Sequence, residues 1–138
     1  FDINTGHVVP SLIHKCFLAK KSKKKFEVWG NPNDRRCFLF SSDASEALYR
    51  CMKQNKYDLI NVGSDKEYKI SDLVKAIKTE LSFKGSINWI NSNIKTIKRR
   101  NVNLNRLKKI GFKEKVILSE GINKTVTWLQ SNYKSARK

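Results

Sequence analysis

The chain has 138 residues, 39% of them hydrophobic, and a formal net charge of +17 at pH 7. This length suits one domain with a sizeable core, and the hydrophobic fraction is too high for a disordered tail. No apolar run approaches the roughly 18 residues that span a bilayer, and no signal or transit peptide is recognisable. We therefore expect one globular domain over residues 1–138, located in the cytoplasm and without a membrane partner.

The excess of basic residues makes nucleic acid a ligand to consider. Lysines dominate residues 20–25, and a second basic run occupies residues 98–100. Both runs could contact phosphates, although the first also suits a solvated helix end, where cations stabilise the helix dipole. No zinc finger, RNA-recognition motif or helix-turn-helix signature accompanies them. Nucleic-acid binding is therefore kept only as an alternative to the main interpretation.

The cysteines and histidines do not have the spacing of a metal site or of a disulfide framework. Cys16, Cys37 and Cys51 are odd in number and widely spaced, and His7 and His14 are the two histidines. Cys16 and Cys51 fall on apolar helical stripes, where a small thiol packs like any other hydrophobic side chain. We expect free thiols and no bound metal.

Hydrophobic periodicity predicts that helices and strands alternate along the chain. The expected elements are a helix over 8–21, strands over 26–29 and 37–40, a helix over 44–52, a strand over 57–62, a helix over 71–81, a strand over 86–90, a short helix over 104–110 and a helix over 120–133. Such alternation is typical of α/β folds. Residues 91–101 are polar and basic and are expected to form a loop whose length is usually tied to function.

Short local signals mark several of these boundaries. Ser42 or Asp43 is the expected N-cap of the second helix, and Ser71 that of the third. Gly111 is placed to end the short helix in the left-handed conformation. The second helix is expected to bury an apolar face made of Ala44, Ala47, Leu48, Cys51 and Met52.

Two motifs in the first third of the chain match a known pattern. Residues 6–13 read G-H-V-V-P-S-L-I, and residues 28–30 read V-W-G, followed by R-C-F-L-F at 36–40. The first is similar to S-H-V-I-P-A-L-I, and the second to V-W-G and R-E-F-L-Y, in the extended short-chain dehydrogenase/reductases. The histidine and the tryptophan resemble the GDP-L-fucose synthase branch of that family.

Two later motifs extend the resemblance to the whole chain. Residues 60–64 and 70–73 resemble the family's I-N-V-G-T-G and I-R-E-L. Residues 107–112 and 121–128 resemble its closing R-L-x-x-L-G-W and G-I-x-x-T-x-x-W. Because the order and the spacing also agree, the match is specific.

The resemblance implies a fold and a missing part. The chain looks like the carboxy-terminal, substrate-binding portion of an extended short-chain dehydrogenase, a Rossmann-type α/β fold. The family's amino-terminal half would carry the catalytic residues of the reduction and the glycine-rich turn for the cofactor pyrophosphate, and no G-x-x-G-x-x-G occurs here. We therefore expect residues 1–138 to be part of a longer chain or to work with a separately encoded half. NADP would be bound mainly by that half, and the full-length form would be a homodimer.

The resemblance also implies an activity for the complete protein. Members of the family invert C3 and C5 of GDP-4-keto-6-deoxymannose or a related GDP-sugar, and then reduce the C4 ketone with NADPH. The chain would be the substrate-binding half of such an epimerase/reductase and would not be an active enzyme by itself. The alternatives are a stand-alone basic module that binds nucleotides or nucleic acid, and an inactive remnant of such an enzyme.

Four residues are implied as substrate contacts by their positions in these motifs. Arg36 aligns with a substrate-binding arginine, and a guanidinium can grip two phosphate oxygens in a fork. Trp29 could pack against the nucleotide, Lys15 replaces a basic contact that is usually arginine, and Arg100 falls at a lysine of the loop that covers the substrate. That loop departs from the family because Lys95 stands where an acidic residue is usual.

His7 is the candidate catalytic residue. Epimerisation beside a ketone requires removing a proton and returning one to the opposite face, and the family uses a cysteine of the missing half together with the histidine that His7 matches. An imidazole suits this task because it can hold or release a proton near neutral pH. The alternatives for His7 are a helix cap or a contact on the nicotinamide side of the cofactor, since a helix N-terminus disfavours an imidazolium. His14 is expected to be a packing or surface residue.

Overall fold

The computed structural model describes residues 1–90 and 102–137. Five helices and four strands lie within these residues, in the order α1 (Val8–Ser22), β1 (Phe26–Trp29), β2 (Arg35–Cys37), α2 (Ser41–Met52), β3 (Glu67–Lys69), α3 (Ile70–Glu80), β4 (Ile87–Ile90), α4 (Asn105–Lys109) and α5 (Leu118–Ser131). The mixture of helices and short strands confirms the expected α/β class, and the bounds of α1, β1 and β4 agree with the sequence to within a residue.

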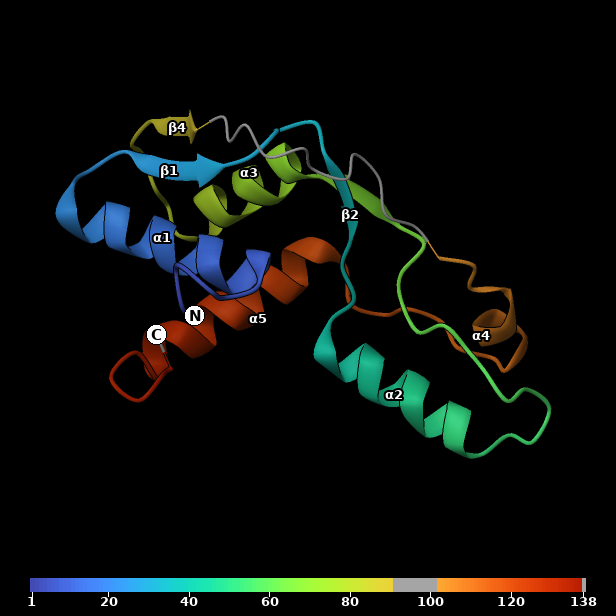
Figure 1. The fold of residues 1–138 in the computed structure, drawn as a ribbon. Coiled ribbons are helices and arrows are strands. Elements are labelled where there is room, and N and C mark those ends of the chain that lie inside the picture. The colour runs from blue at the N-terminus through green and yellow to red at the C-terminus, as the bar shows by residue number, and fades with distance from the viewer. Residues whose placement is uncertain (91–101, 138) are drawn as a thin grey trace.

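Strands β1 and β4 form a parallel pair in which Phe26 lies opposite Ile87 and Trp29 opposite Ile90. Successive side chains of a strand point to opposite faces, so Phe26 and Val28 are buried whereas Trp29 is exposed. In Figure 1 the pair lies above α1 and α3, with α5 below them. These elements enclose the larger hydrophobic cluster, whose fully buried members include Ile13, Cys16, Phe26, Val28, Leu73, Val74, Ile77 and Leu129.

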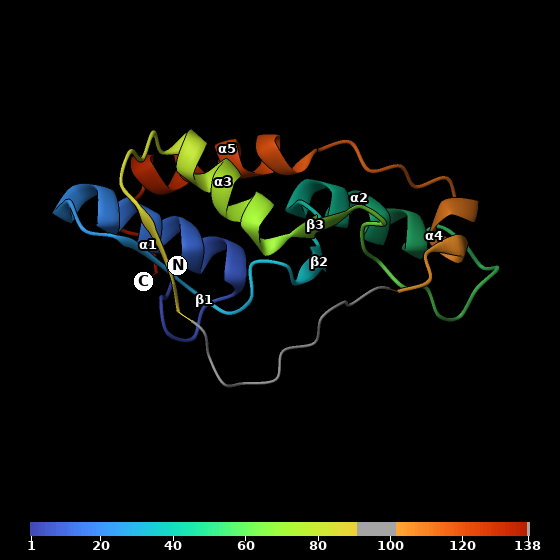
Figure 2. The ribbon, with the colours of Figure 1, turned by 90° about the horizontal axis from the view of Figure 1, so that it is seen from above.

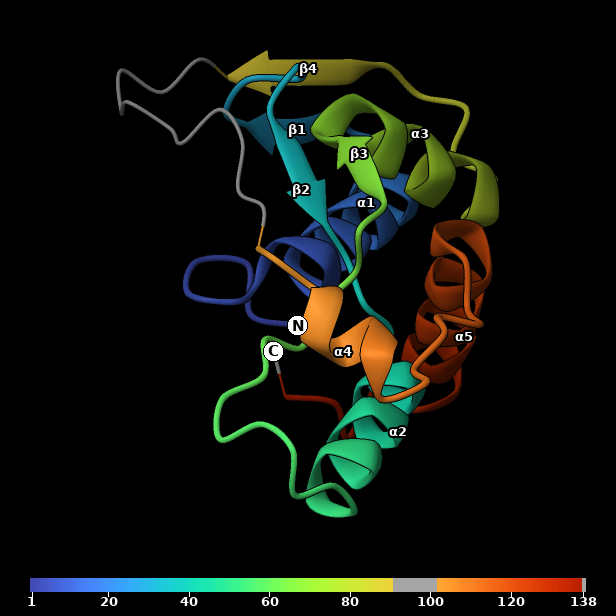
Figure 3. The ribbon, with the colours of Figure 1, turned by 90° about the vertical axis from the view of Figure 1, so that its right-hand side faces the viewer.

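The rest of the chain forms a second, smaller cluster. Helix α2 packs against α4, and the buried residues there are Ala47, Leu104, Leu107 and Phe112. Figure 3 shows α2 and α4 together at the side away from β1 and β4. The antiparallel pair β2–β3, with Arg36 opposite Tyr68, lies between the two clusters.

Two of the expected strands are wrong. The strand expected over 37–40 lies at Arg35–Cys37, where it forms β2. Its position is set by its antiparallel partner β3, at Glu67–Lys69, a strand that we did not expect from the sequence. Residues 57–62 form no strand, and no backbone N–H of 58–62 donates to another backbone group in the described part of the chain. A strand exists only where a neighbour completes its ladder, and none of the described residues supplies that neighbour.

Helix α2 also differs from the expectation. Ser42, Asp43 and, in α3, Ser71 lie inside the helices rather than at the N-caps, which are Phe40 and Lys69. Of the face expected to be buried, Ala47 is fully buried, whereas Leu48 is 56% and Met52 83% exposed. The side of α2 that carries these two residues therefore has no partner among the described residues.

Candidate functional site

The candidate site lies where β1 and β4 end. Ligands of open α/β folds bind beyond the carboxyl ends of parallel strands, and Trp29 is the last residue of β1. Its side chain is 64% exposed, which is high for a tryptophan on a strand. Gly30 then turns the chain with a φ of 105°, a conformation that favours glycine. Its N–H donates to the carbonyl of Ile90 at 3.1 Å, so the two strand ends are held together.

Lys15 lies beside this tryptophan. It belongs to α1, and its Nζ lies 5.2 Å from the centre of the Trp29 ring, a cation–π contact. The indole thereby offers a flat apolar face, and the ammonium adds a positive charge next to it. This combination suits a planar base linked to an anionic group.

His7 stands at the beginning of α1. It is the N-cap residue, in an extended conformation, and its exposed side chain makes no capping hydrogen bond. The expectation that it lies at a helix start is confirmed, and the capping alternative has no support in the geometry. Lys15 follows about two helical turns later, and α1 and β1 run in opposite directions, so the start of α1 lies toward the carboxyl end of β1 (Figure 1).

Arg36 lies on β2 next to a nearly buried carboxylate. Its Nη2 is 3.8 Å from Oδ2 of Asp34, a residue with only 5% of its surface exposed. Its Nη1 donates to the carbonyl of Arg35 at 2.8 Å. Asp34 is in turn anchored through its backbone, because the N–H of Ile70 donates to its carbonyl at 2.9 Å. The guanidinium of Arg36 is therefore held by the Asp34 carboxylate and by the carbonyl of Arg35.

The structure brings some of the predicted residues together and leaves others apart. Lys15 and Trp29 are in contact, and Arg36 follows Trp29 after the turn that Gly30 begins. Within the described residues, His7 makes no hydrogen bond or ring contact with this pair. Arg100 and Lys95 lie outside the described residues.

An apolar groove adjoins the start of α1. It has a volume of about 390 Å³ and lies between Val9 and Pro10 of α1, residues 37–41 and the beginning of α5. The groove brings the end of β2 close to the residues that follow His7. The catalytic candidate and the strand that carries Arg36 thus border one region of the surface.

Two features were missed at the level of the sequence. Asp34 lies two residues before Arg36, but the expected strand began at Cys37, so no sequence pattern placed this carboxylate beside the guanidinium. Tyr49 and Lys53 have the Tyr-x-x-x-Lys spacing that short-chain dehydrogenases use for catalysis. In the structure both are exposed at the end of α2, with the Lys53 Nζ 4.5 Å from the Tyr49 ring centre, so the match is one of spacing alone.

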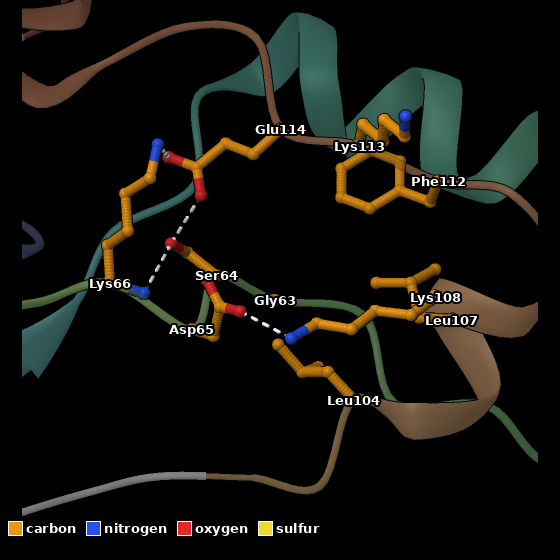
Figure 4. Close-up of a pocket in the computed structure, with 10 residues that line it drawn as sticks. All are labelled: Gly63, Ser64, Asp65, Lys66, Leu104, Leu107, Lys108, Phe112, Lys113 and Glu114. Carbon is orange, nitrogen blue, oxygen red and sulfur yellow. Dashed lines mark hydrogen bonds and ion pairs between the residues drawn. The ribbon is translucent and has the colours of Figure 1, made fainter.

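A separate pocket of about 350 Å³ opens between residues 63–66, α4 and residues 112–114 (Figure 4). The Ser64 hydroxyl donates to Glu114 Oε2 at 2.6 Å, and Lys108 Nζ lies 2.6 Å from Asp65 Oδ2. The hydrogen bond from Lys108 holds the pKa of the Asp65 carboxyl below its ordinary value. Four of its five charged side chains form two ion pairs, Lys66 with Glu114 and Lys108 with Asp65. Because none of the predicted site residues lines it, this pocket is distinct from the candidate site.

The described residues were also considered as metal ligands and as reactive thiols. Within residues 1–90 and 102–137, no three His, Cys, Asp or Glu side chains gather where they could hold a metal ion. Cys16 is fully buried, and burial raises the pKa of its thiol to about 12, so it stays protonated and inert. His14 is buried as well, with Nδ1 2.7 Å from the carbonyl oxygen of Phe1, which is a packing role.

Comparisons with known proteins relate the chain to nucleotide-sugar enzymes. A probable GDP-L-fucose synthase 1 from Oryza sativa subsp. japonica is 31% identical over 140 residues, covering 100% of this chain and 43% of the relative. A GDP-L-colitose synthase from Yersinia pseudotuberculosis is 31% identical over 132 residues, covering 91% and 42% respectively. The crystal structure of a GDP-L-fucose synthetase from Naegleria fowleri bound to NADP superposes with a TM-score of 0.85 at 29% identity, covering 100% of this chain and 43% of that one.

The chain is homologous to the carboxy-terminal part of the GDP-L-fucose synthases. It spans less than half the length of these relatives. No family model matches the chain. The fucose synthase relatives confirm the resemblance read from the motifs, and the superposition confirms the carboxy-terminal portion of an extended short-chain dehydrogenase fold. None of the described helices is long and apolar enough to cross a bilayer.

Proposed function

We propose that this chain is the substrate-binding half of a GDP-sugar epimerase/reductase. The observation that carries the proposal is the Lys15–Trp29 pair, exposed where the parallel strands β1 and β4 end. The indole packs against the nucleotide, while Lys15 and Arg36 neutralise the diphosphate. Arg100, in the adjoining loop, adds a further cation.

His7 exchanges the proton in this proposal. A carbon beside the C4 ketone loses its proton to a base on one face, leaving an enolate, and receives a proton from an acid on the other face. Two groups must therefore flank the sugar. We assign His7 as one of them because its exposed imidazole lies at the start of α1 and makes no capping hydrogen bond; the second belongs to the other half of the enzyme.

The residues of this chain do not fit the pyrophosphate of NADP. Such a site needs a glycine-rich turn between a strand and a helix N-terminus. The described helices that follow strands, α2 and α3, begin after Phe40 and Lys69 and have no such turn. In this proposal NADP is held by an amino-terminal, nucleotide-binding half, and the reduction of the C4 ketone takes place there. A nicotinamide-side contact from His7 remains compatible with its exposed position.

The unpartnered side of α2 supports such a second half. Leu48, Tyr49 and Met52 are more than half exposed, and so is Leu59 in the loop that follows. The backbone N–H groups of 58–62 lack backbone acceptors within the described residues. An exposed apolar surface beside an open backbone edge is typical of an interface. We propose that the nucleotide-binding half packs there, in the same chain or as a separate one, and that the complete enzyme is a homodimer.

The binding step can be tested with adjacent arginines of β2. Arg36→Ala should weaken GDP binding by about 1.5–3 kcal/mol, the range for hydrogen bonds to charged groups, in a calorimetric titration. Arg35→Ala removes the same charge from the opposite face of the strand and should leave the affinity within about threefold. Equal losses in both variants would show that Arg36 has no specific role.

The catalytic step needs the complete enzyme. His7→Asn should abolish uptake of solvent deuterium at C3 or C5 of the sugar, measured by mass spectrometry, while binding of the GDP-sugar stays almost intact. Normal exchange in this variant would remove His7 from the mechanism. Loss of binding together with exchange would assign His7 to positioning the sugar instead.

A further inference from the structure

One end of the molecule carries a dense group of lysines that the proposed function does not use. It is formed by the last turn of α1, the turn before β1, and the end of α3 with the loop after it. We call it the lysine end, and it comprises Lys20, Lys21, Lys23, Lys24, Lys25, Lys78 and Lys84. Glu80, the last residue of α3, is the acidic residue of these segments, and Glu27 of β1 is the next one along the chain.

The fold brings these segments together. The N–H of Phe26 donates to the carbonyl of Ser86 at 3.0 Å, so the beginnings of β1 and β4 are adjacent. Lys20 Nζ donates to the carbonyl of Leu81 at 2.8 Å, which joins α1 to the loop after α3. In Figures 1 and 2 this end is on the left, where the parallel strands begin. The candidate site lies at the other end of the same strands.

Most lysines of the lysine end make no contact that engages their charge within the described residues. Lys20 binds a carbonyl, and Lys21 and Lys78 lie over the rings of Tyr133 and Phe83. The four remaining lysines are exposed and, within the described part of the chain, have no carboxylate within ion-pair distance; they are Lys23, Lys24, Lys25 and Lys84.

These four also exceed what a helix end needs. The nearby Glu80 accepts a hydrogen bond from Asn123 at 2.7 Å, so it is already engaged. Lys20 and Lys21 already complement the dipole in the last turn of α1. Lys23 has a φ of 56°, a conformation in which glycine or asparagine is preferred.

The surroundings of these lysines select the kind of polyanion. Phe26 and Phe83, which follow Lys25 and precede Lys84 in the sequence, are buried, so neither ring offers a surface on which bases can stack. None of the large exposed hydrophobic residues of the described chain lies at this end, so nothing here inserts into a bilayer. The lysines therefore offer a set of point charges, which suits regularly spaced phosphates. Of the two forms of nucleic acid, a duplex has a higher charge density along its axis than a single strand.

We propose that the lysine end binds the phosphate backbone of double-stranded nucleic acid without reading its sequence. Lys23, Lys24, Lys25 and Lys84 are the contacts, and this site is independent of the GDP-sugar site. The inference does not rest on the proposed enzymatic function.

The test is fluorescence anisotropy of a short labelled DNA duplex titrated with the chain at several salt concentrations. Changing all four lysines to glutamine should lower the affinity at least about tenfold at low salt and reduce the slope of log K against log salt by about 3–4, as expected for four phosphate contacts. A matched variant removes the same charge from exposed lysines near α2 and α4 and should lose less than about threefold; its positions are Lys53, Lys56, Lys109 and Lys113. Circular dichroism melting verifies that both variants fold.

Three kinds of result would overturn the inference, and a fourth would support it. Equal losses in the two variants would show a response to net charge alone. Displacement of the duplex by GDP at constant ionic strength would place it at the Arg36 site. Tighter binding of single strands, or of vesicles containing phosphatidylserine, would assign the surface to another partner. Loss of GDP binding in Arg36→Ala with duplex binding unchanged would separate the two sites as proposed.

Discussion

At the residue scale, the proposed contact of Trp29 with the nucleotide can be tested by substitution, with a second exposed tryptophan as the control. Trp29→Ala should weaken GDP binding by about 1–3 kcal/mol, the usual contribution of a base stacked on an aromatic ring. The melting temperature should change little because this side chain is 64% exposed. The measurement is calorimetric titration with GDP, alongside thermal melting.

Trp128 is the control for this change. It is 51% exposed and stacks on Phe1, with ring centres 5.8 Å apart, on a different part of the surface. Trp128→Ala should leave the affinity for GDP unchanged. If both variants bind GDP like the unchanged chain, the Lys15–Trp29 pair is not the nucleotide contact.

The buried thiol of Cys16 should make the free energy of unfolding depend on pH in the alkaline range. Burial raises the pKa of its thiol from 9.0 to about 12 in the folded state. Between these values the unfolded chain loses this proton and the folded chain keeps it, so the unfolded state binds fewer protons and the free energy of unfolding falls as pH rises. Denaturant melts between pH 8 and 11 should show a steeper fall for the unchanged chain than for Cys16→Ala.

This comparison removes the background of the other titrating groups. Lysines and tyrosines titrate in both proteins, so only the difference in slope reports on Cys16. Iodoacetamide should also spare Cys16 in the native state while it modifies the half-buried Cys37 or Cys51. Parallel pH profiles together with rapid native alkylation of Cys16 would contradict the raised pKa.

At the scale of elements, a buried carboxylate joins α2 to the chain before α5. Asp43, only 3% exposed, accepts hydrogen bonds from the N–H groups of Lys115 and Val116 at 3.0 and 2.9 Å. Asp43→Ala should lower the free energy of unfolding by about 1–3 kcal/mol, because two backbone donors lose their acceptor. Asp58→Ala, at an exposed position, should change it by less than about 0.5 kcal/mol in the same urea titration. Equal effects would mean that the buried carboxylate contributes nothing specific.

The exposed side of α2 makes a second prediction at this scale. Leu48 and Met52 lie one helical turn apart, and both are largely exposed. Replacing both with glutamine should reduce binding of a hydrophobic dye and any self-association without lowering the melting temperature. The buried Ala47 is the contrast, since Ala47→Gln should destabilise the cluster between α2 and α4. Unchanged dye binding in the double variant would argue against α2 as an interface.

At the scale of the whole molecule, the chain alone should not bind NADPH tightly. Its sequence contains no G-x-x-G-x-x-G motif, the glycine-rich turn that holds the pyrophosphate. Titration followed by NADPH fluorescence should therefore show no micromolar affinity. Addition of a nucleotide-binding half should restore binding and, at the same time, lower dye binding at α2. Micromolar binding of NADPH by the chain alone would contradict the division of the enzyme into two halves.

Local sequence by itself determined much of this protein. Periodicity placed α1, β1, β4 and α5 because their buried faces repeat at regular intervals, and those intervals depend on neighbours along the chain. Gly111 takes the expected left-handed conformation, with a φ of 81°. The motifs around His7, Trp29 and Arg36 identified the family, since residue type and spacing can be read without coordinates.

Only the tertiary structure decided the features that depend on distant segments. The ladder of β2 was set by β3, and residues 57–62 form no strand because pairing requires a neighbouring strand, which the described residues do not supply. The same dependence left Leu48 and Met52 exposed, since burial requires a second surface as well as an apolar side chain. The cation–π contact of Lys15 with Trp29 joins two elements, and the convergence of the lysines arises from the packing of α1 against α3 and β1 against β4. No periodicity along the sequence encodes these contacts, because they form only when the chain folds back on itself.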